Sequence, residues 1–313
     1  MQGPIYLEYR SAPCAVAFMS RAIVTAARSG FRDRQLPLAA TWRGHRVAGK
    51  ALDCFLALTG LADDNPYWAL LYPHVAGFRL QMALLTHPAF PFPIWGALQI
   101  RNHLVLHRSF ARGEVLEMHT CVDAQRALEK GTEVDLRSTA RAGGELAWEG
   151  LNTFYYRGRQ GGRDAQSPLA TAPRLEGSIA TRWVAPVAAR WRFGKLTGDY
   201  NGIHLSRWYA RRFGFQGAFL HPQRVLGQCL ARLPRPDRAT PLRLDAWLKG
   251  PAYYGSDLAL RVAETRDAVA FALHVDGDER PAIIGRYTRL AEYSSAILSS
   301  KNAVGLGAFM KRR

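Results

Sequence analysis

A short polar segment in the second half of the chain combines a carboxylate, an amide and an imidazole within six residues. Residues 197–204 read Thr-Gly-Asp-Tyr-Asn-Gly-Ile-His, so its chemically active side chains are Asp199, Asn201 and His204. A carboxylate and a histidine held close together can share one water molecule and move protons near neutral pH. The segment therefore predicts a general acid–base site.

The surrounding residues indicate where this cluster lies. Its composition is typical of a turn, and the residues after it repeat an apolar side chain at helical spacing, at Leu205, Trp208, Tyr209 and Phe213. The cluster is therefore expected at the entrance of a helix. A purely structural interpretation also exists, in which Asp199 or Asn201 caps that helix and His204 is a hydrogen-bonded interior histidine.

The extended pattern favours the catalytic interpretation. Residues 193–230 resemble the signature of the MaoC-like dehydratase family, which includes the (R)-specific enoyl-CoA hydratases. That signature runs Gly-Asp-x-Asn-Pro-apolar-His, then a small residue, a Gly-Phe pair and a His-Gly pair. The matching residues here are Asp199, Asn201, His204, Ala210, Gly214, Phe215 and His221.

The resemblance implies an α+β fold of two hot-dog units, each a long helix wrapped by an antiparallel sheet. It implies reversible hydration of a trans-2-enoyl thioester, or dehydration of an (R)-3-hydroxyacyl thioester, on coenzyme A or an acyl carrier protein. Neither a cofactor nor a metal is expected. Asp199 and His204 would hold the water and move its protons, and Asn201 would help to position it. The substrate-binding candidates are Gly198, Tyr200, His221 and Gln223.

Two residues depart from the family pattern. Gly202 replaces a proline, which predicts a less constrained loop. Pro222 replaces the glycine whose N–H polarises the thioester carbonyl in the family, and proline has no N–H. Loss of one such donor costs about 100-fold to 1,000-fold in rate elsewhere. Gln223, the next residue at the same helix start, is expected to offer its N–H instead.

Hydrophobic periodicity predicts the same order of elements on both sides of a polar, glycine-rich segment at residues 157–168. A helix comes first, at Tyr67–Leu85 and again at Pro222–Leu233, and strand-like segments with alternating polarity follow. The strands are expected at Leu98–His107, Val115–Asp123, Thr132–Ala140, Leu146–Tyr156, Leu242–Lys249, Asp257–Glu264, Ala268–Val275 and Ala282–Leu290. A further amphipathic helix is expected at Ala15–Ser29.

These elements predict an N-terminal hot-dog-like unit over residues 1–165 and a C-terminal unit carrying the site over residues 171–313. Leu-Thr-Gly occurs at residues 58–60 and 196–198, and a proline follows Tyr72 and His221 near each helix. Asp64-Asn65-Pro66 resembles part of the signature in the first unit, but no histidine follows at the matching distance. The first unit is therefore expected to lack the site and to widen the acyl tunnel.

Composition limits the remaining classes. The 313 residues are 48% hydrophobic, which suffices for a large core, and no apolar run is long enough for a membrane span. The net charge is +17, and residues 171–313 hold 23 of the 42 Lys and Arg but only 11 of the 25 Asp and Glu. This excess suits a phosphate-bearing or acidic carrier, and Arg207, Arg211 and Arg212 are candidates to meet it.

Other interpretations stay open at this point. A hot-dog protein that binds acyl thioesters without catalysis is one, supported by Gly202 and Pro222. A nucleic-acid-binding protein is another, supported only by charge and not expected. The four cysteines are far apart without a CxxC pair, which favours a reducing cytoplasm over a disulfide framework. A homodimer is possible, although two units can pair within one chain.

Overall fold

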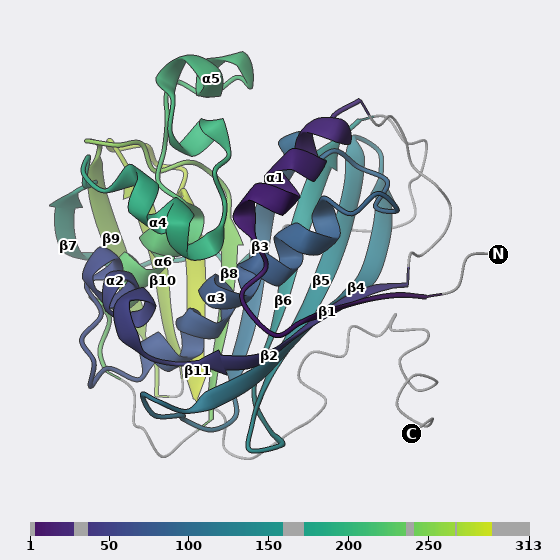
Figure 1. Cartoon of the computed structure of the whole chain (residues 1–313). Coiled ribbons are helices and arrows are strands. Elements are labelled where there is room, and N and C mark those ends of the chain that lie inside the picture. The colour runs from purple at the N-terminus through teal and green to yellow at the C-terminus, as the bar shows by residue number, and fades with distance from the viewer. Residues whose placement is uncertain (1–3, 28–36, 159–171, 236–240, 267, 290–313) are drawn as a thin grey trace.

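The computed structural model describes residues 4–27, 37–158, 172–235, 241–266 and 268–289. Helices of these segments lie on one face of a curved sheet, except that α5 stands away from the body (Figure 1). The α-helices are α1 (Ala15–Val24), α2 (Gly49–Thr59), α3 (Tyr67–Leu85), α4 (Arg190–Thr197), α5 (Arg207–Arg212) and α6 (Pro222–Leu230). Two short 3-10 helices are η1 (Ile94–Gly96) and η3 (Gly202–His204).

The described strands form one 11-stranded sheet in the order β1-β2-β4-β5-β6-β3-β8-β11-β10-β9-β7. All neighbouring pairs are antiparallel except β1 with β2. The strands are β1 (Ile5–Tyr9), β2 (Leu38–Arg46), β3 (Ala97–Leu106), β4 (Val115–Leu128), β5 (Gly131–Ala142), β6 (Glu145–Arg157), β7 (Ser178–Val184), β8 (Leu242–Leu248), β9 (Asp257–Glu264), β10 (Ala268–Val275) and β11 (Ile283–Arg289).

The long helix α3 forms the centre of the first half. Every residue of its 19 is buried except Arg79, because the strands of the first half cover one side of it and α1, α2, α4 and α6 pack against the rest. A helix that is apolar on all sides has no other stable place than such a core. Pro73 lies inside this helix, so the Tyr72-Pro73 pair does not begin it, whereas Pro222 is the first residue of α6.

The shorter helix α6 takes the corresponding place in the second half, and it is buried from Gln223 to Leu230. Its middle lies against the end of α2. A Cβ atom added at Gly227 would come within 2.4 Å of the Thr59 side chain. Glycine therefore allows the two helices to approach so closely.

A six-residue repeat ties the two halves together. The sequence Phe-x-x-Leu-Thr-Gly ends both α2 (residues 55–60) and α4 (residues 193–198). In each, the threonine hydroxyl donates to the carbonyl of the phenylalanine, and the glycine adopts a positive φ. When the two copies of this repeat are aligned, Leu61 corresponds to Asp199. In this alignment Asp64-Asn65-Pro66 does not correspond to the segment that begins at Asp199.

The predicted elements that follow each central helix are confirmed, with ends within a few residues. The sequence patterns did not predict β1, β2, α2, α4, β7 or the two 3-10 helices. The first amphipathic helix ends at Val24, earlier than Ser29. Most of the segment at residues 157–168 and the chain after residue 289 lie outside the described residues.

We expect Gly227→Ala to lower the free energy of unfolding by about 1–3 kcal/mol, because its methyl group must displace Thr59. Helix propensity alone predicts the opposite sign, since alanine favours a helix by about 1 kcal/mol over glycine. Urea unfolding followed by circular dichroism measures the difference. Gly96→Ala is the control, because nothing lies within 4 Å of its Cβ position. Equal stability of the two variants would contradict the close packing.

Candidate functional site

Backbone and side-chain hydrogen bonds shape the loop between α4 and α5. The Thr197 hydroxyl accepts from the N–H of Asp199, and the Asp199 carboxylate accepts through Oδ1 from the N–H of Asn201 at 3.0 Å. The side-chain Oδ1 of Asn201 in turn accepts from the N–H of Ile203 at 3.2 Å, which caps η3. The capping interpretation is therefore wrong for the longer helix, because Asn201 caps only η3 and the Ser206 side chain caps α5. Oδ2 of Asp199 takes no part in the hydrogen bonds of these turns.

Gly202 occupies a crowded position in this loop. A Cβ atom there would lie 2.6 Å from the Tyr209 ring, which packs directly on the glycine. The Tyr209 ring therefore fills the space beside the position where the family signature has proline. Packing supplies some of the constraint that the missing proline would give.

His204 faces Asp199 from the end of η3. Its Nε2 lies 3.7 Å from Asp199 Oδ2, too long for a direct hydrogen bond but suited to a shared water. Its Nδ1 lies 3.0 Å from the carbonyl oxygen of Phe219, to which it donates, so Nε2 is the acceptor in the neutral ring. Burial lowers the pKa of His204, although the Asp199 charge opposes that shift. The imidazole is therefore a neutral base.

His221 lies behind His204 and stacks on it, with ring centroids 4.0 Å apart. It is 1% exposed and donates through Nε2 to the backbone carbonyl of Asp199 at 3.1 Å. Burial, with the neighbouring His204, holds the pKa of His221 well below the ordinary value. Its role in this geometry is to support the Asp199 backbone and the His204 ring.

A cavity of about 250 Å³ opens beside this pair, and both halves of the chain line it. Asp199, Asn201 and His204 stand at its polar side. The first half contributes mostly apolar residues: Phe78, Met82, Ile94, Ala97, Leu98, Gln99, Ile100, Phe154 and Arg157. The second half adds Ile203, Phe215, Phe219, Leu220, Pro222, Gln223, Val225, Leu248, Lys249, Gly250, Pro251, Ala252 and Ile283. An acid–base pair thus borders an apolar chamber.

The N-terminus of α6 also borders the cavity. Pro222 is its first residue and has no N–H, but the backbone N–H of Gln223 follows it. Among the described residues, no acceptor is bound to this N–H. The Gln223 side chain donates to the side-chain oxygen of Gln99 in β3.

Two of the predicted substrate-binding residues lie elsewhere. Gly198 does not line the cavity, because it ends α4 with a φ of 76° and lies against the Phe18 ring. Tyr200 turns its ring toward Trp191, with centroids 6.2 Å apart, and is likewise outside the lining. His221 is beneath the site, and Gln223 alone of the four lines the cavity.

The sequence did not show which residues of the first half line this cavity. Gln99 is one of four polar residues in β3, and Phe78 and Met82 belong to a helix that is buried on all sides. No local pattern marks which of these side chains face a cavity. The only available signal was the expectation that the first half widens the tunnel.

Asp199, His204 and His221 are also the one described cluster of side chains that can hold a metal ion, with ligand atoms within 4.8 Å of one another. Such binding would require His221 Nε2 to leave the Asp199 carbonyl and lose its proton. The observed hydrogen bonds instead fit a metal-free proton-transfer pair.

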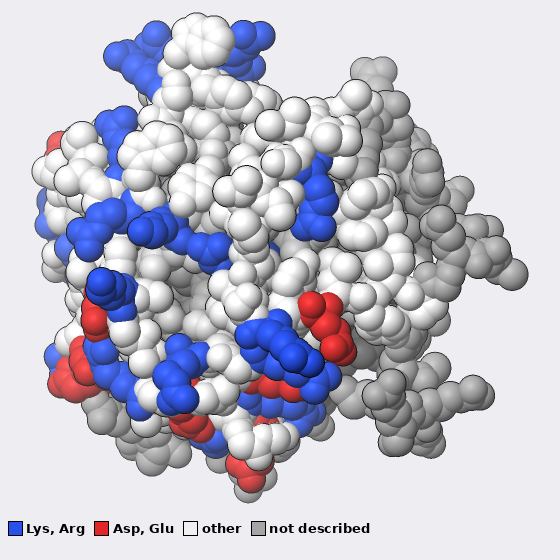
Figure 2. Space-filling view, viewed as in Figure 1, with Lys and Arg blue, Asp and Glu red and all other residues white. Residues whose placement is uncertain are grey.

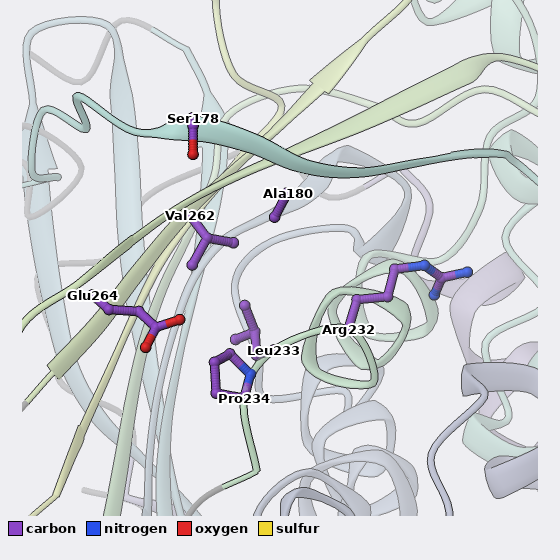
Figure 3. A pocket seen from close by; sticks show the side chains of 7 residues that line it. All are labelled: Ser178, Ala180, Arg232, Leu233, Pro234, Val262 and Glu264. Carbon is purple, nitrogen blue, oxygen red and sulfur yellow. The ribbon is translucent and has the colours of Figure 1, made fainter.

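A second hollow, of about 610 Å³, lies at the sheet edge, between β7, β9 and the end of α6 (Figure 3). Its charged side chains, Arg232 and Glu264, stand on opposite sides of it, and Arg232 lies over the Trp183 ring. No acid–base pair converges there among the described residues.

Protonation of the two histidines is expected only below the usual imidazole range. Their lowered pKa values mean that the unfolded chain binds more protons than the folded one below about pH 6.5. Buried His74, whose pKa falls to about 4, adds to this. The free energy of unfolding should therefore decrease between pH 7 and pH 5. Imidazole NMR signals that titrate near 6.5 for His204 and His221 in the folded protein, as expected in urea, would contradict the burial argument.

Comparison with known proteins supports the same fold. No family model matches this chain. A curated relative, 3-hydroxyacyl-thioester dehydratase X of Mycobacterium tuberculosis, is 28% identical over 180 residues, which cover 57% of this chain and 64% of the relative. This chain therefore spans somewhat less than two thirds of that relative.

Solved structures extend the comparison. A crystal structure of HtdX from Mycobacterium tuberculosis superposes with a TM-score of 0.67 at 23% identity, covering 80% of this chain and all of that one. A MaoC-like dehydratase from Phytophthora capsici gives 0.63 at 18% identity, covering 82% and 96%. A third structure, from Mycobacterium tuberculosis and described as a double hot-dog fold, gives 0.51 at 14% identity, covering 79% and 93%. The chain therefore has the double hot-dog fold found among MaoC-like dehydratases, as the sequence resemblance implied.

Proposed function

We propose that this protein catalyses the reversible addition of water to a trans-2-enoyl thioester, or the dehydration of an (R)-3-hydroxyacyl thioester. The observation that carries the proposal is the pair of Asp199 Oδ2 and His204 Nε2, 3.7 Å apart at the wall of an apolar cavity. The dehydratase names of the relative and of the structural neighbours support it.

In the hydration direction, Asp199 and His204 both bind one water on the side of the cavity. His204 Nε2 accepts a proton from it while the water oxygen attacks C3 of the enoyl chain. The Asp199 carboxylate orients the water and stabilises the imidazolium that forms. The proton then passes from this pair to C2, so that the elements of one water are added across the double bond. Asn201 supports the pair by capping η3, which ends at His204.

Negative charge develops on the thioester oxygen during this step, and it needs a hydrogen-bond donor. Pro222 cannot supply one. The start of α6, where Gln223 lines the cavity, is the place at which the carbonyl would be held.

The acyl chain would occupy the apolar part of the cavity. Phe78 and Met82 of α3 and Phe154 of β6 line it from the first half. We therefore propose a division of labour, in which residues 1–165 form a site-less unit that shapes the acyl chamber. Residues 171–313 form the unit that carries the catalytic pair.

The carrier would be coenzyme A or an acyl carrier protein, both of which are negatively charged. Arg207, Arg211 and Arg212 lie on α5, next to the catalytic loop, and basic side chains gather at this projecting helix (Figure 2). Positive charge on this helix would attract either carrier.

A cytoplasmic location and a homodimer are further parts of the proposal. The four cysteines are free, which suits a reducing compartment. No described helix is both long and apolar enough to cross a membrane.

A thioester-binding protein without catalysis is the second candidate, and Pro222 is the observation that favours it. Such a protein would bind enoyl thioesters without hydrating them. The packing of Tyr209 on Gly202 speaks for a preorganised loop and therefore for catalysis.

Replacement of either member of the pair tests the proposed chemistry. Asp199→Asn and His204→Ala should each lower kcat for trans-2-enoyl-CoA hydration by about 1,000-fold, because the water loses its proton acceptor or its orientation. Loss of the enoyl absorbance measures the rate, and circular dichroism checks the fold. Activity near that of the wild type in either variant would refute the assignment.

The shape of the cavity predicts chain-length selectivity. Ala97 is half-buried at the cavity wall, so Ala97→Phe should fill part of the chamber without disturbing the deep core. We expect the ratio of kcat/KM for a C12 enoyl-CoA to that for crotonyl-CoA to fall by about tenfold. An unchanged ratio would place the acyl chain elsewhere.

A further inference from the structure

A chain of polar side chains runs from the candidate site into the core of the first half. The Gln223 carboxamide donates to the Gln99 oxygen, and Gln99 Nε2 donates to Asn152 Oδ1 at 2.7 Å. Asn152 Nδ2 then donates to Gln81 Oε1 at 2.6 Å. All of these except Gln99 are fully buried, and Gln99 is partly buried.

The position of Gln99 results from an irregularity in β3. The register between β3 and β6 shifts between Gln99 and Arg101, and pairing of β3 with β8 begins only at Arg101. Such bulges redirect side chains. Leu98, Gln99 and Ile100 consequently all line the cavity, and Gln99 reaches α6 in the other half.

The hydrogen bonds determine which end of each amide faces the site. Gln99 Nε2 is bound to Asn152 and lies 3.3 Å from His74 Nε2, and burial keeps His74 neutral by lowering its pKa to about 4. The oxygen of Gln99 therefore points to Gln223, which must present its NH₂ group. Gln99 takes one of the two hydrogens. Among the described residues, the other has no acceptor, and Gln223 borders the cavity.

We propose that Gln99 is a positioning residue that holds the Gln223 carboxamide as an oxyanion donor, in place of the N–H that Pro222 lacks. This inference rests on the proposed function, because the carbonyl it serves is that of the thioester. A carboxamide fixed in this way donates to the developing charge without reorganising first. This role also gives the buried amides a function. Burying an amide costs desolvation free energy that an apolar side chain at the same position would not cost.

Near-isosteric substitutions distinguish a hydrogen bond from the Gln223 side chain from one donated by its backbone N–H. Gln223→Met removes the carboxamide and keeps the backbone N–H, and Gln99→Met removes only its support. Gln228→Met is the control, because Gln228 is buried on the same helix but does not line the cavity. We expect kcat to fall about 100-fold in Gln223→Met and about tenfold in Gln99→Met, with KM changed less, and to stay within twofold in the control.

A binding measurement tests the same contact without turnover. Butyryl-CoA carries the carbonyl, and S-butyl-CoA lacks it. The wild type should bind the thioester several-fold more tightly than the thioether, because one hydrogen bond to the carbonyl contributes a difference in affinity of that size. Gln223→Met should lose this preference, Gln99→Met should lose most of it, and Gln228→Met should keep it.

The outcomes distinguish the inference from the proposed function. A wild type without turnover, whose preference for the carbonyl disappears in Gln223→Met and Gln99→Met, would refute catalysis and support the donor. Full activity and an unchanged preference in Gln223→Met would overturn the inference and leave the backbone N–H as the donor. A wild type that shows neither turnover nor a preference would count against both.

Discussion

The contact between α6 and α2 holds the candidate site in place. Gly227 presents no side chain, so Thr59 packs directly on the backbone of α6, and the two helices cross at close range. Thr59 also closes the last turn of α2 by donating to the carbonyl of Phe55. This contact sets the position of α6 beside α3. The beginning of α6 thereby lies at the cavity wall, where the site needs a hydrogen-bond donor.

Only the second half carries the proposed catalytic pair, although a sequence repeat occurs in both halves. Both halves close a helix with Phe-x-x-Leu-Thr-Gly, and in both the threonine hydroxyl makes the same bond. Beyond the glycine the halves diverge. The second continues with Asp199 and a loop of hydrogen-bonded turns, whereas the first continues with Leu61, which is buried. An apolar residue at that position is compatible with a core and not with proton transfer.

The buried histidines illustrate how the fold prepares the site. Each ring has one nitrogen bound to a backbone carbonyl, Phe219 for His204 and Asp199 for His221. Their stacking and burial keep both rings neutral and fix their orientation. Nε2 of His204 is thereby left 3.7 Å from Oδ2 of the Asp199 carboxylate, so that both atoms can bind one water molecule.

The sequence by itself determined the local features of this protein. Periodicity located the strands, because apolar side chains alternate where one face is buried, and a long, almost wholly apolar segment marked α3. The spacing of Asp199, Asn201 and His204 located the site, because a short loop brings its own side chains together. Tertiary structure decided what no local pattern encodes: that Gln99 reaches Gln223 from the other half, that Tyr209 packs on Gly202, and that Gly198 and Tyr200 face away from the cavity. These contacts join residues far apart in the chain or depend on the direction of a turn, and packing alone determines both.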